Sequence, residues 1–374
     1  MPTSTKATDL TVIASEGVRG AQVLMGCVEL EPTLSFFLQR LQFRINAIFP
    51  ADRPTTAMIS GHGLSIRLVR GVDAGVSTVY LLCDDPVRVG HGETVLKAPN
   101  GITIKLEMAD PPMHQPIPRP ALVVTRAADM EDWSVGRAGM RYHDILPNRW
   151  GGAFIASQIR ILDGGLVPDY EHFHKVRFQV IFCRRGWVRV AYEGQGEPIV
   201  MHPGDCVLQP PMIRHRVLES SPQAEVIEVG TPAEHITMAD HTISLPNADL
   251  QPGRDFNGQQ FVFHVAKGAQ WSPWRIPGFE CSDTGISAST QGLAGVRVVR
   301  YKCEALGSSQ HHDTEFCFFF VLSGSVTVEL DTSRQRLETD DSIAIPGGMR
   351  YTLCEASPDL SLLEVSLPGE VVPG

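Results

Sequence analysis

The chain has 374 residues, of which 43% are hydrophobic, with 32 Lys and Arg against 42 Asp and Glu and a formal net charge of −10. This length and composition predict two or three compact domains with sizeable cores. The basic residues are scattered, which argues against nucleic acid or an anionic membrane as partner. The sequence lacks a signal-peptide pattern and any apolar run of membrane-spanning length, so we expect a soluble, cytoplasmic protein.

The chain alternates between short β-type segments and turns, and helical periodicity is scarce. Most segments are β-branched or alternating and end at Gly or Pro, which is typical of β-sandwiches and barrels. Two Pro-rich stretches, 110–120 and 244–253, mark boundaries. We therefore predict a mainly β protein with the following plan: an N-terminal domain 1–112, a linker 113–125, a barrel 126–240, a linker 241–257 and a second barrel 258–374.

The N-terminal domain has its own pattern. AQVLMGCVEL is predicted as a strand, and EPTLSFFLQRL as a helix, because Leu34, Phe37, Leu38 and Leu41 recur at helical spacing. FRINAIFP, TTAMISGHG and LSIRLVRG follow as three more strands. The expected element order is therefore βαβββ, a small α+β domain.

Three histidines in the region 126–240 have the spacing of a metal site. His172 and His174 lie one residue apart in a predicted strand, so both project to the same face. Gln179 follows in the continuing strand, and a separate predicted strand brings His215. Three imidazoles from two segments of one sheet interior form most of a first-row metal site.

The region 258–374 looks like a copy of the region 126–240. An offset of 138 takes His172 to Gln310 and Gly186 to Gly324. Repetition at a fixed offset predicts that both regions have the same strand plan.

These motifs resemble those of the cupins. The run His172-x-His174-x4-Gln179-x6-Gly186 resembles the first cupin signature, with Gln in place of Glu. The run Gly204-x5-Pro210-x-Met212-x2-His215 resembles the second, with Met in place of Gly. The resemblance implies two antiparallel jelly-roll barrels, a bicupin. It also implies one divalent metal, Fe, Mn, Ni, Cu or Zn, held by the three histidines and by Gln179 if the amide ligates; otherwise Gln179 hydrogen-bonds a water or a substrate atom.

A glutamine at position 179 changes the charge of the site. A dication on neutral ligands keeps its full charge, whereas a carboxylate would halve it. The carboxylate that serves as general base in some cupins is then missing, and a base must come from elsewhere. The candidates are Glu219, Glu228 and His235, each of which is otherwise a surface or supporting group.

The second barrel departs from the ligand pattern. Its equivalents of His172, His174, Gln179 and His215 are Gln310, His312, Cys317 and Tyr351. His311 and His312 are adjacent and point to opposite faces, so they cannot chelate one ion on a strand. We expect this copy to be metal-free, structural or an accessory cavity; the alternative is a metal on Gln310, His312 and Cys317.

The N-terminal domain resembles vicinal-oxygen-chelate modules in the segment LKAPNGITIKLEMADP. In those modules metal binds on the first and last strands. Only Glu107 matches here, so a non-catalytic module is expected.

The eight cysteines are dispersed without a CxxC pair, which predicts buried free thiols, not disulfides or a zinc site.

Three functions remain open from the sequence. The favoured one is a mononuclear non-haem Fe(II) dioxygenase acting on a small dicarbonyl, enediol or aromatic diol, because O2 activation needs open coordination positions more than a carboxylate. The second is a non-redox isomerase, lyase or hydrolase acting on a sugar or keto acid. The third is a small-molecule-binding bicupin without catalysis. A homodimer is the expected assembly.

Overall fold

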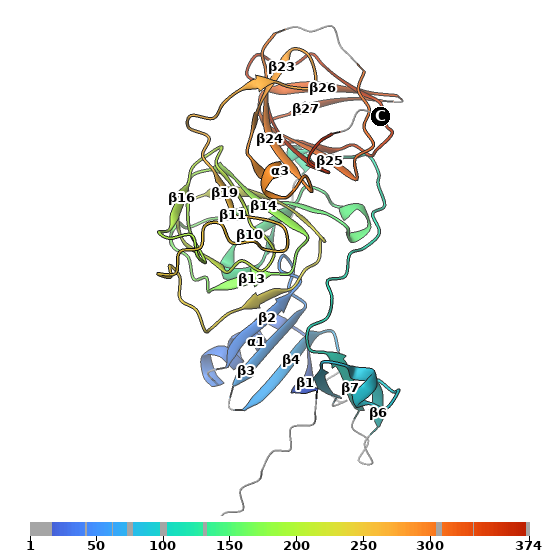
Figure 1. The fold of residues 1–374 in the computed structure, drawn as a ribbon, viewed down its shortest axis with the longest axis vertical. Helices are drawn as coiled ribbons and strands as arrows, with labels where there is room; N and C mark the ends of the chain where they lie inside the picture. Colours follow the sequence, from blue (N-terminus) through green and yellow to red (C-terminus); the bar gives the residue numbers. More distant parts are fainter. Residues whose placement is uncertain are drawn as a thin grey trace, which may run out of the picture. The chain divides into compact units, whose positions relative to one another are not determined.

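The protein consists mainly of β-strands (Figure 1). The computed structural model describes residues 17–41, 43–61, 63–72, 78–97, 103–129, 133–303, 309–331 and 333–371. The chain divides into two compact units, one made of Met1–Asn46 with Thr55–Pro112 and the other of Ala47–Pro54 with Met113–Gly374. None of the described helices is long and apolar enough to cross a membrane.

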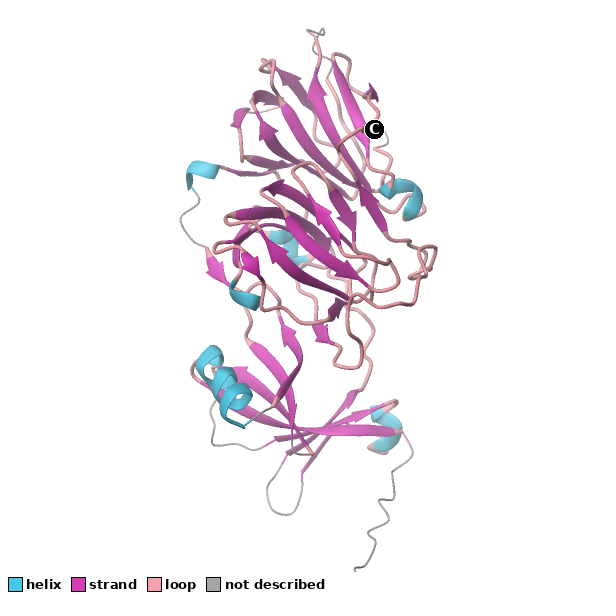
Figure 2. Cartoon of the chain, turned by 90° about the vertical axis from the view of Figure 1, so that its left-hand side faces the viewer, coloured by secondary structure: helices cyan, strands magenta, loops and turns pink. Residues whose placement is uncertain are grey.

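The first unit contains one mixed sheet and two helices. Its elements are β1 (Val18–Cys27), α1 (Leu30–Leu41), β2 (Arg44–Phe49), β3 (Thr56–Gly61), β4 (Leu64–Arg70), β5 (Thr78–Cys83), α2 (Pro86–Val89), β6 (Val95–Lys97) and β7 (Thr103–Met108). Of β2, only residues 44–46 belong to this unit. The strand order is β3-β4-β1-β5-β7-β6, and β1 runs parallel to β4. Helix α1 packs on β3 and β4 (Figure 2) with Leu34 buried. The βαβββ order predicted from the sequence is found in the first five elements.

The second unit contains a two-sheet barrel formed mainly by residues 134–239, which we call the first barrel. Its strands are β9 (Ser134–Val135), β10 (Arg141–Asp144), β11 (Ile155–Ile161), β12 (Gly165–Leu166), β13 (His172–His174), β14 (Phe178–Arg185), β15 (Val188–Tyr192), β16 (Ile199–Met201), β17 (Cys206–Leu208), β18 (His215–Ser220), β19 (Ala224–Thr231), β20 (Thr237–Ala239) and β21 (Val262–His264). Three 3-10 turns join them: η1 (Ala127–Asp129), η2 (Arg137–Gly139) and η3 (Arg149–Gly152). One sheet has the order β21-β17-β14-β19-β11-β10-β9 and the other contains β16-β15-β18-β13-β20.

The second barrel repeats this plan, and lies beside the first within the same unit (Figure 1). Its elements are β8 (Val123–Thr125), β22 (Ser272–Pro273), β23 (Phe279–Asp283), α3 (Ile286–Ser289), β24 (Gly295–Tyr301), β25 (Phe316–Ser323), β26 (Ser325–Leu330), β27 (Arg334–Glu338), β28 (Ser342–Ala344), β29 (Tyr351–Cys354) and β30 (Ser361–Leu367). The sheets are β22-β23-β24-β30-β25-β28-β8 and β27-β26-β29. The prediction of a mainly β fold with two barrels after a small α+β domain is confirmed.

The two barrels exchange short strands. Strand β8 lies in the segment predicted as a linker, and it pairs with β28 of the second barrel. Strand β21 lies in the segment predicted as the second barrel, and it pairs with β17 of the first. Each barrel is therefore completed by chain that precedes the other barrel.

A shared apolar core lies between the two large sheets. Alternation along β14 directs Phe178, Val180 and Phe182 into this core, while β25 contributes Phe316 and Phe318. The same alternation turns the intervening residues toward the interior of each barrel. This packing fixes which residues of β14 and β25 face a barrel cavity.

Glycine is required at the turn after the central strand of each barrel. Gly186 has φ 68° and Gly324 has φ 71°, a conformation that disfavours side chains. A Cβ at Gly186 would lie 2.2 Å from the Ser221 hydroxyl, and one at Gly324 would lie 2.3 Å from that of Ser357. The pairing of these two glycines in the sequence thus reflects one repeated turn.

The cysteines are free, in agreement with the sequence prediction, but not all of them are buried. Cys83, Cys183, Cys206, Cys281 and Cys317 are buried, whereas Cys27 and Cys354 are half-buried and Cys303 is exposed. The prediction of uniformly buried thiols is wrong for the last three.

Candidate metal centre

Three histidines of the first barrel converge on one point. His172 and His174 lie on β13, and His172 pairs in register with His215 at the start of β18. One ring nitrogen from each residue lies within 4.8 Å of the other two. The side chains are 0%, 7% and 4% exposed respectively, so water has little access to the cluster. The strand spacing of the first two histidines and the cross-strand register of the third therefore build one three-nitrogen site.

The Nδ1 atom of each histidine is held by a neighbouring oxygen. The contacts are His172 Nδ1 with the Tyr170 carbonyl at 2.7 Å, His215 Nδ1 with the Ile213 carbonyl at 3.1 Å and His174 Nδ1 with the Thr237 hydroxyl at 3.1 Å. These contacts leave the Nε2 atoms for a common ligand, and His172 Nε2 is buried without a hydrogen-bond partner in the described part of the chain. Oxygen-anchored imidazoles with free second nitrogens are the arrangement that metal-ligating histidines adopt.

The histidines are neutral near pH 7. Burial lowers the pKa of His172 and of His174 well below 6.5, with neighbouring charged and imidazole groups adding to the effect. Burial also lowers the pKa of His215 to about 3. Since a metal binds the neutral imidazole, the chain keeps all three ligands in the binding form. The residues present therefore fit a divalent metal.

Gln179 lines the same cavity as His174 and His215. Its side chain is 2% exposed, and its Nε2 donates a hydrogen bond to the Glu228 carboxylate. A carboxylate accepts only from the amide nitrogen, so this contact fixes the orientation of the amide. The Oε1 atom is buried and has no hydrogen-bond partner among the described residues. A buried unpaired acceptor is costly unless an ion or a donor satisfies it.

The three candidate bases differ in position. Glu228 and His235 line the cavity with His174 and His215. The His235 ring centroid lies 5.0 Å from that of His174. Glu219 is not part of the cavity lining: it forms an ion pair with Arg189 at 2.6 Å and its side chain is 32% exposed. The structure therefore places Glu219 outside the cavity that Glu228 and His235 line.

Sequence reasoning missed Arg137, which also lines the cavity. It lies in η2 and forms a buried ion pair with Asp169. The signal was present in the sequence, because Trp133-Ser-x-x-Arg137 recurs at the offset of 138 as Trp271-Ser-x-x-Arg275. An arginine in a glycine-rich turn has no periodicity, and only the repeat could have identified it.

The rest of the cavity wall is mainly aliphatic. The lining includes Ile159, Ile161, Ile181, Val188, Val190 and Val217. A cavity with apolar walls and a few converging polar groups is the common form of a small-molecule site. Its walls suit a compact ligand with an apolar body.

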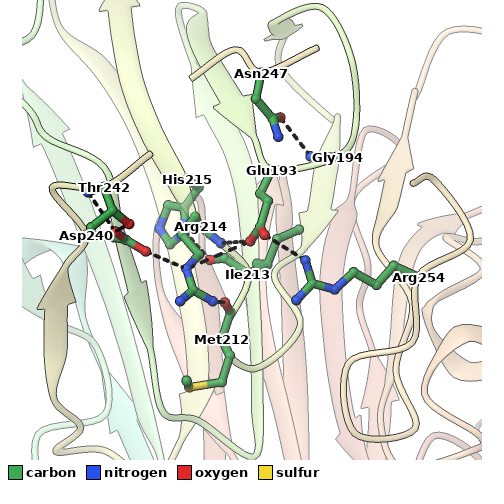
Figure 3. A network of polar contacts seen from close by, with 10 residues as sticks. All are labelled: Glu193, Gly194, Met212, Ile213, Arg214, His215, Asp240, Thr242, Asn247 and Arg254. Atoms are coloured by element: carbon green, nitrogen blue, oxygen red, sulfur yellow. Dashed lines mark hydrogen bonds and ion pairs between the residues drawn. The ribbon is translucent and has the colours of Figure 1, made fainter. Parts of the chain in front are cut away.

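A polar network holds the segment that leads into His215 (Figure 3). Arg214 binds Asp240 at 3.0 Å and the Met212 carbonyl at 3.1 Å, while its backbone nitrogen donates to Glu193. Glu193 in turn binds Arg254 at 2.6 Å. The network lies on the outer side of the strand and fixes the position from which His215 enters the cavity.

The second barrel keeps the register of the site but has different groups at its centre. Gln310 pairs with Tyr351 as His172 pairs with His215. Within the part of the chain that the structure describes, the His172–His174–His215 group is the one cluster of three or more potential metal-ligating side chains. The centre of the second barrel holds Arg275, which forms an ion pair with Glu364 and donates to the Tyr351 hydroxyl at 3.1 Å.

Two other sequence candidates of the second barrel are buried near this arginine. Burial raises the pKa of the Cys317 thiol, and burial together with Arg275 lowers the pKa of His312 to about 4. His312 is fully buried and its Nδ1 contacts the Thr314 hydroxyl at 2.6 Å. These groups are neutral near pH 7, and the cation beside them is a guanidinium.

In the first unit, the half-exposed Glu107 has an arginine partner. Arg67 forms an ion pair with Glu107 at 3.1 Å and donates to Gln22 Oε1 on β1 at 3.0 Å. The guanidinium thus links the first strand of this unit to its last.

Comparisons with known proteins support the fold. Residues 297–365, in the second barrel, match the model of the cupin domain. Protein Ylba from E. coli is similar, with 10% identity over 70% of this chain and 96% of its own and a TM-score of 0.50. A salicylate 1,2-dioxygenase from Pseudaminobacter salicylatoxidans is also similar, with 15% identity over 67% of this chain and 86% of its own and a TM-score of 0.51. No curated protein sequence matches the chain.

These comparisons identify a fold, since identities of this size carry no further information. They agree with the two-barrel architecture and with the cupin resemblance of the sequence motifs. The vicinal-oxygen-chelate resemblance of the N-terminal domain has no support among them.

Proposed function

We propose that this chain is a metal-dependent bicupin enzyme whose first barrel binds one divalent ion on His172, His174 and His215. The observation that carries the proposal is the convergence of three neutral, oxygen-anchored imidazoles, two of which line an aliphatic cavity. We further propose that the ion is Fe(II) and that the protein is a dioxygenase. Its substrate would be a small dicarbonyl, enediol or aromatic diol.

The ligand set supports this assignment. A divalent iron there would supply redox chemistry and open coordination positions for O2 and a chelating substrate. The histidines and Gln179 carry no charge, so these ligands themselves leave the charge of the ion undiminished. The unpaired Oε1 of Gln179 is the fourth donor that the chain itself offers.

The remaining groups of the cavity bind and orient the substrate. Aliphatic side chains exclude water and contact the carbon skeleton, which suits a diketone or an aromatic diol better than a sugar. Glu228 lies beside Gln179 and can accept the proton that an enol or a phenol loses on binding. His235 is the second group that can accept or return a proton at this end of the cavity.

The same carboxylate supports a second candidate. With Glu228 in the cavity, the site has the general base that its sequence motif lacks. A base next to a Lewis-acid ion is the equipment of an isomerase, lyase or hydrolase acting on a keto acid. The apolar walls make this candidate less suited to a sugar.

One experiment separates these functions. The protein is produced without added metal, its metal content is measured, and O2 consumption is followed with Fe(II) and a panel of diketones and catechols. We expect O2 uptake that depends on iron and is lost in His172→Ala, while His312→Ala in the second barrel retains it. Tightly bound zinc without O2 uptake would favour the non-redox enzyme. Absence of metal from the wild type and His172→Ala alike would leave only a binding protein.

A further inference from the structure

Each barrel sends one arginine into its interior from the turn of its first hairpin. Arg137 lies between β9 and β10, and Arg275 between β22 and β23. The tryptophan four residues earlier is stacked in both barrels against an arginine of the next strand pair. Trp133 lies under Arg160 at 4.1 Å and Trp271 under Arg300 at 3.8 Å. The two turns are therefore anchored in the same way.

Each barrel also carries a buried glutamate at the same place on its last long strand. Glu228 pairs with Ile181 of β14, and Glu364 pairs with Phe319 of β25. Glu228 is 8% exposed and Glu364 is 0% exposed. A buried carboxylate needs a cation or several donors to offset the loss of water.

Arg137 and Arg275 form ion pairs with acids at different positions. Arg275 forms its ion pair with Glu364 and binds the hydroxyl of Tyr351, the residue at the register position of His215. Arg137 instead pairs with Asp169, on the segment that precedes β13. Among the described residues, no Lys or Arg lies within ion-pair distance of Glu228, which accepts from the Gln179 amide. In the described part of the chain, the first barrel thus has a carboxylate that shares a cavity with His174 and His215 and has no direct ion-pair partner.

We propose that Asp169 is a positioning residue that holds Arg137 away from Glu228 and so keeps the centre of the first barrel open for a metal ion. The inference rests on the metal site proposed above. In the second barrel the guanidinium against Glu364 reaches the position equivalent to His215. An arginine released in the first barrel would therefore lie against the histidine cluster and repel a dication at short range.

The sequence of the second barrel agrees with this role. The offset of 138 that relates Arg137 to Arg275 takes Asp169 to Gly307, which has no acceptor side chain and lies outside the described residues. The difference at this sequence position agrees with the different ion-pair partners of Arg137 and Arg275.

The contacts of Asp169 determine the variant. Its Oδ1 accepts from Arg137, and its Oδ2 accepts from the Val217 backbone at 2.9 Å. Asp169→Asn retains one oxygen for Val217 and replaces the other by an NH2 group, which cannot accept from a guanidinium. Asp169→Ser, with a single hydroxyl, serves as a second variant if Asp169→Asn is poorly folded.

The test measures Zn²⁺ affinity by competition with a chelating dye in the full-length protein. We expect Asp169→Asn to weaken binding by about tenfold or more, because the released Arg137 opposes the ion. Adding Arg137→Met to Asp169→Asn removes that cation, and affinity should return to within about threefold of the wild type. Wild-type affinity in Asp169→Asn, or an equal loss in the double variant, would overturn the inference. An equal loss would mean that Asp169 acts only through His172, whose Nδ1 lies 3.8 Å from the Asp169 Oδ1.

A metal-free crystal structure of Asp169→Asn supplies a readout that does not depend on metal binding. We expect the Arg137 guanidinium to form an ion pair with Glu228. If it stays where it is in the wild type, the inference fails. If instead the wild type and His172→Ala bind Zn²⁺ equally poorly, the proposed metal site fails, and the position of Arg137 in this crystal structure still decides the role of Asp169.

Discussion

The two barrels have the same strand plan, but their buried glutamates have different partners. In the second barrel Glu364 forms an ion pair with Arg275, and Trp274 donates to its other oxygen at 3.2 Å. In the first barrel Glu228 accepts from a neutral amide beside three neutral imidazoles. The second barrel therefore contains its own cation, whereas the first presents donors that suit a cation from solution.

This difference shows how little must change to convert one kind of centre into the other. The core between the barrels, the glycine turns and the cross-strand registers are alike in both. The contrast lies in a few inward side chains and in the partner of one arginine. Fold and chemistry are therefore set by different residues of the same strands.

The largest expected effect concerns the internal cation of the second barrel. Arg275→Met leaves Glu364 buried without its main ion-pair partner, which should lower the free energy of unfolding by about 3–5 kcal/mol. Denaturant unfolding measures this. Adding Glu364→Gln removes the orphaned charge and should recover part of the loss. The control is Arg189→Met, whose half-exposed ion pair with Glu219 should cost below about 1 kcal/mol when it is lost. Equal costs for Arg275→Met and Arg189→Met would contradict the assigned role of Arg275.

The next largest effect is expected in the dependence of stability on pH, because most of the histidines with a lowered pKa lie in the first barrel. Below pH 6.5 the unfolded chain binds protons that the folded metal-free protein does not, since burial lowers the pKa of His215 to about 3. The contribution of neutral His215 to the free energy of unfolding is therefore fully present above pH 6.5 and is lost as the pH drops toward 3. One such histidine contributes a slope of about 1.4 kcal/mol per pH unit in this window.

The measurement is chemical denaturation of the metal-free protein between pH 7.5 and 5. In His215→Gln the slope below pH 6.5 should decrease by about the contribution of one histidine. An unchanged slope would mean that His215 is protonated in the folded protein, and it would then be a poor metal ligand.

A smaller effect is expected at the network of Figure 3. Arg214→Met removes the contacts to Asp240 and Met212 and the stacking on Phe173 at 4.2 Å, at an expected cost of about 1–2 kcal/mol. Arg350, at the equivalent position of the second barrel, is exposed. Arg350→Met is therefore the matched control, with an expected change below about 0.5 kcal/mol by thermal or denaturant unfolding. Similar decreases in the free energy of unfolding for Arg214→Met and Arg350→Met would contradict the stabilising role assigned to Arg214.

The sequence predicted much of the fold and part of the site. Alternation placed His172 and His174 on one face, and the repeat paired Gln310 with the position of His172, a pairing that the registers of both barrels reproduce. These predictions succeeded because they depend on local periodicity and on a fixed offset.

The remaining features depend on contacts distant in sequence. Strands β8 and β21 are each three residues long. β8 precedes the first barrel but pairs with the second, and β21 precedes the second barrel but pairs with the first. Periodicity in the sequence does not reveal such pairing. Glu219 and Glu228 looked alike as candidate bases until the strand registers turned one outward and the other into the cavity. Arg137 required the repeat for its detection and the fold for its partner, Asp169.

Metal stoichiometry tests the central claim most directly, and equilibrium dialysis against Fe(II) without oxygen measures it. The account predicts one tightly bound ion per chain in the wild type, none in His172→Ala and one in His312→Ala. No bound ion in the wild type, or two ions of which one is lost in His312→Ala, would contradict the division of roles between the two barrels.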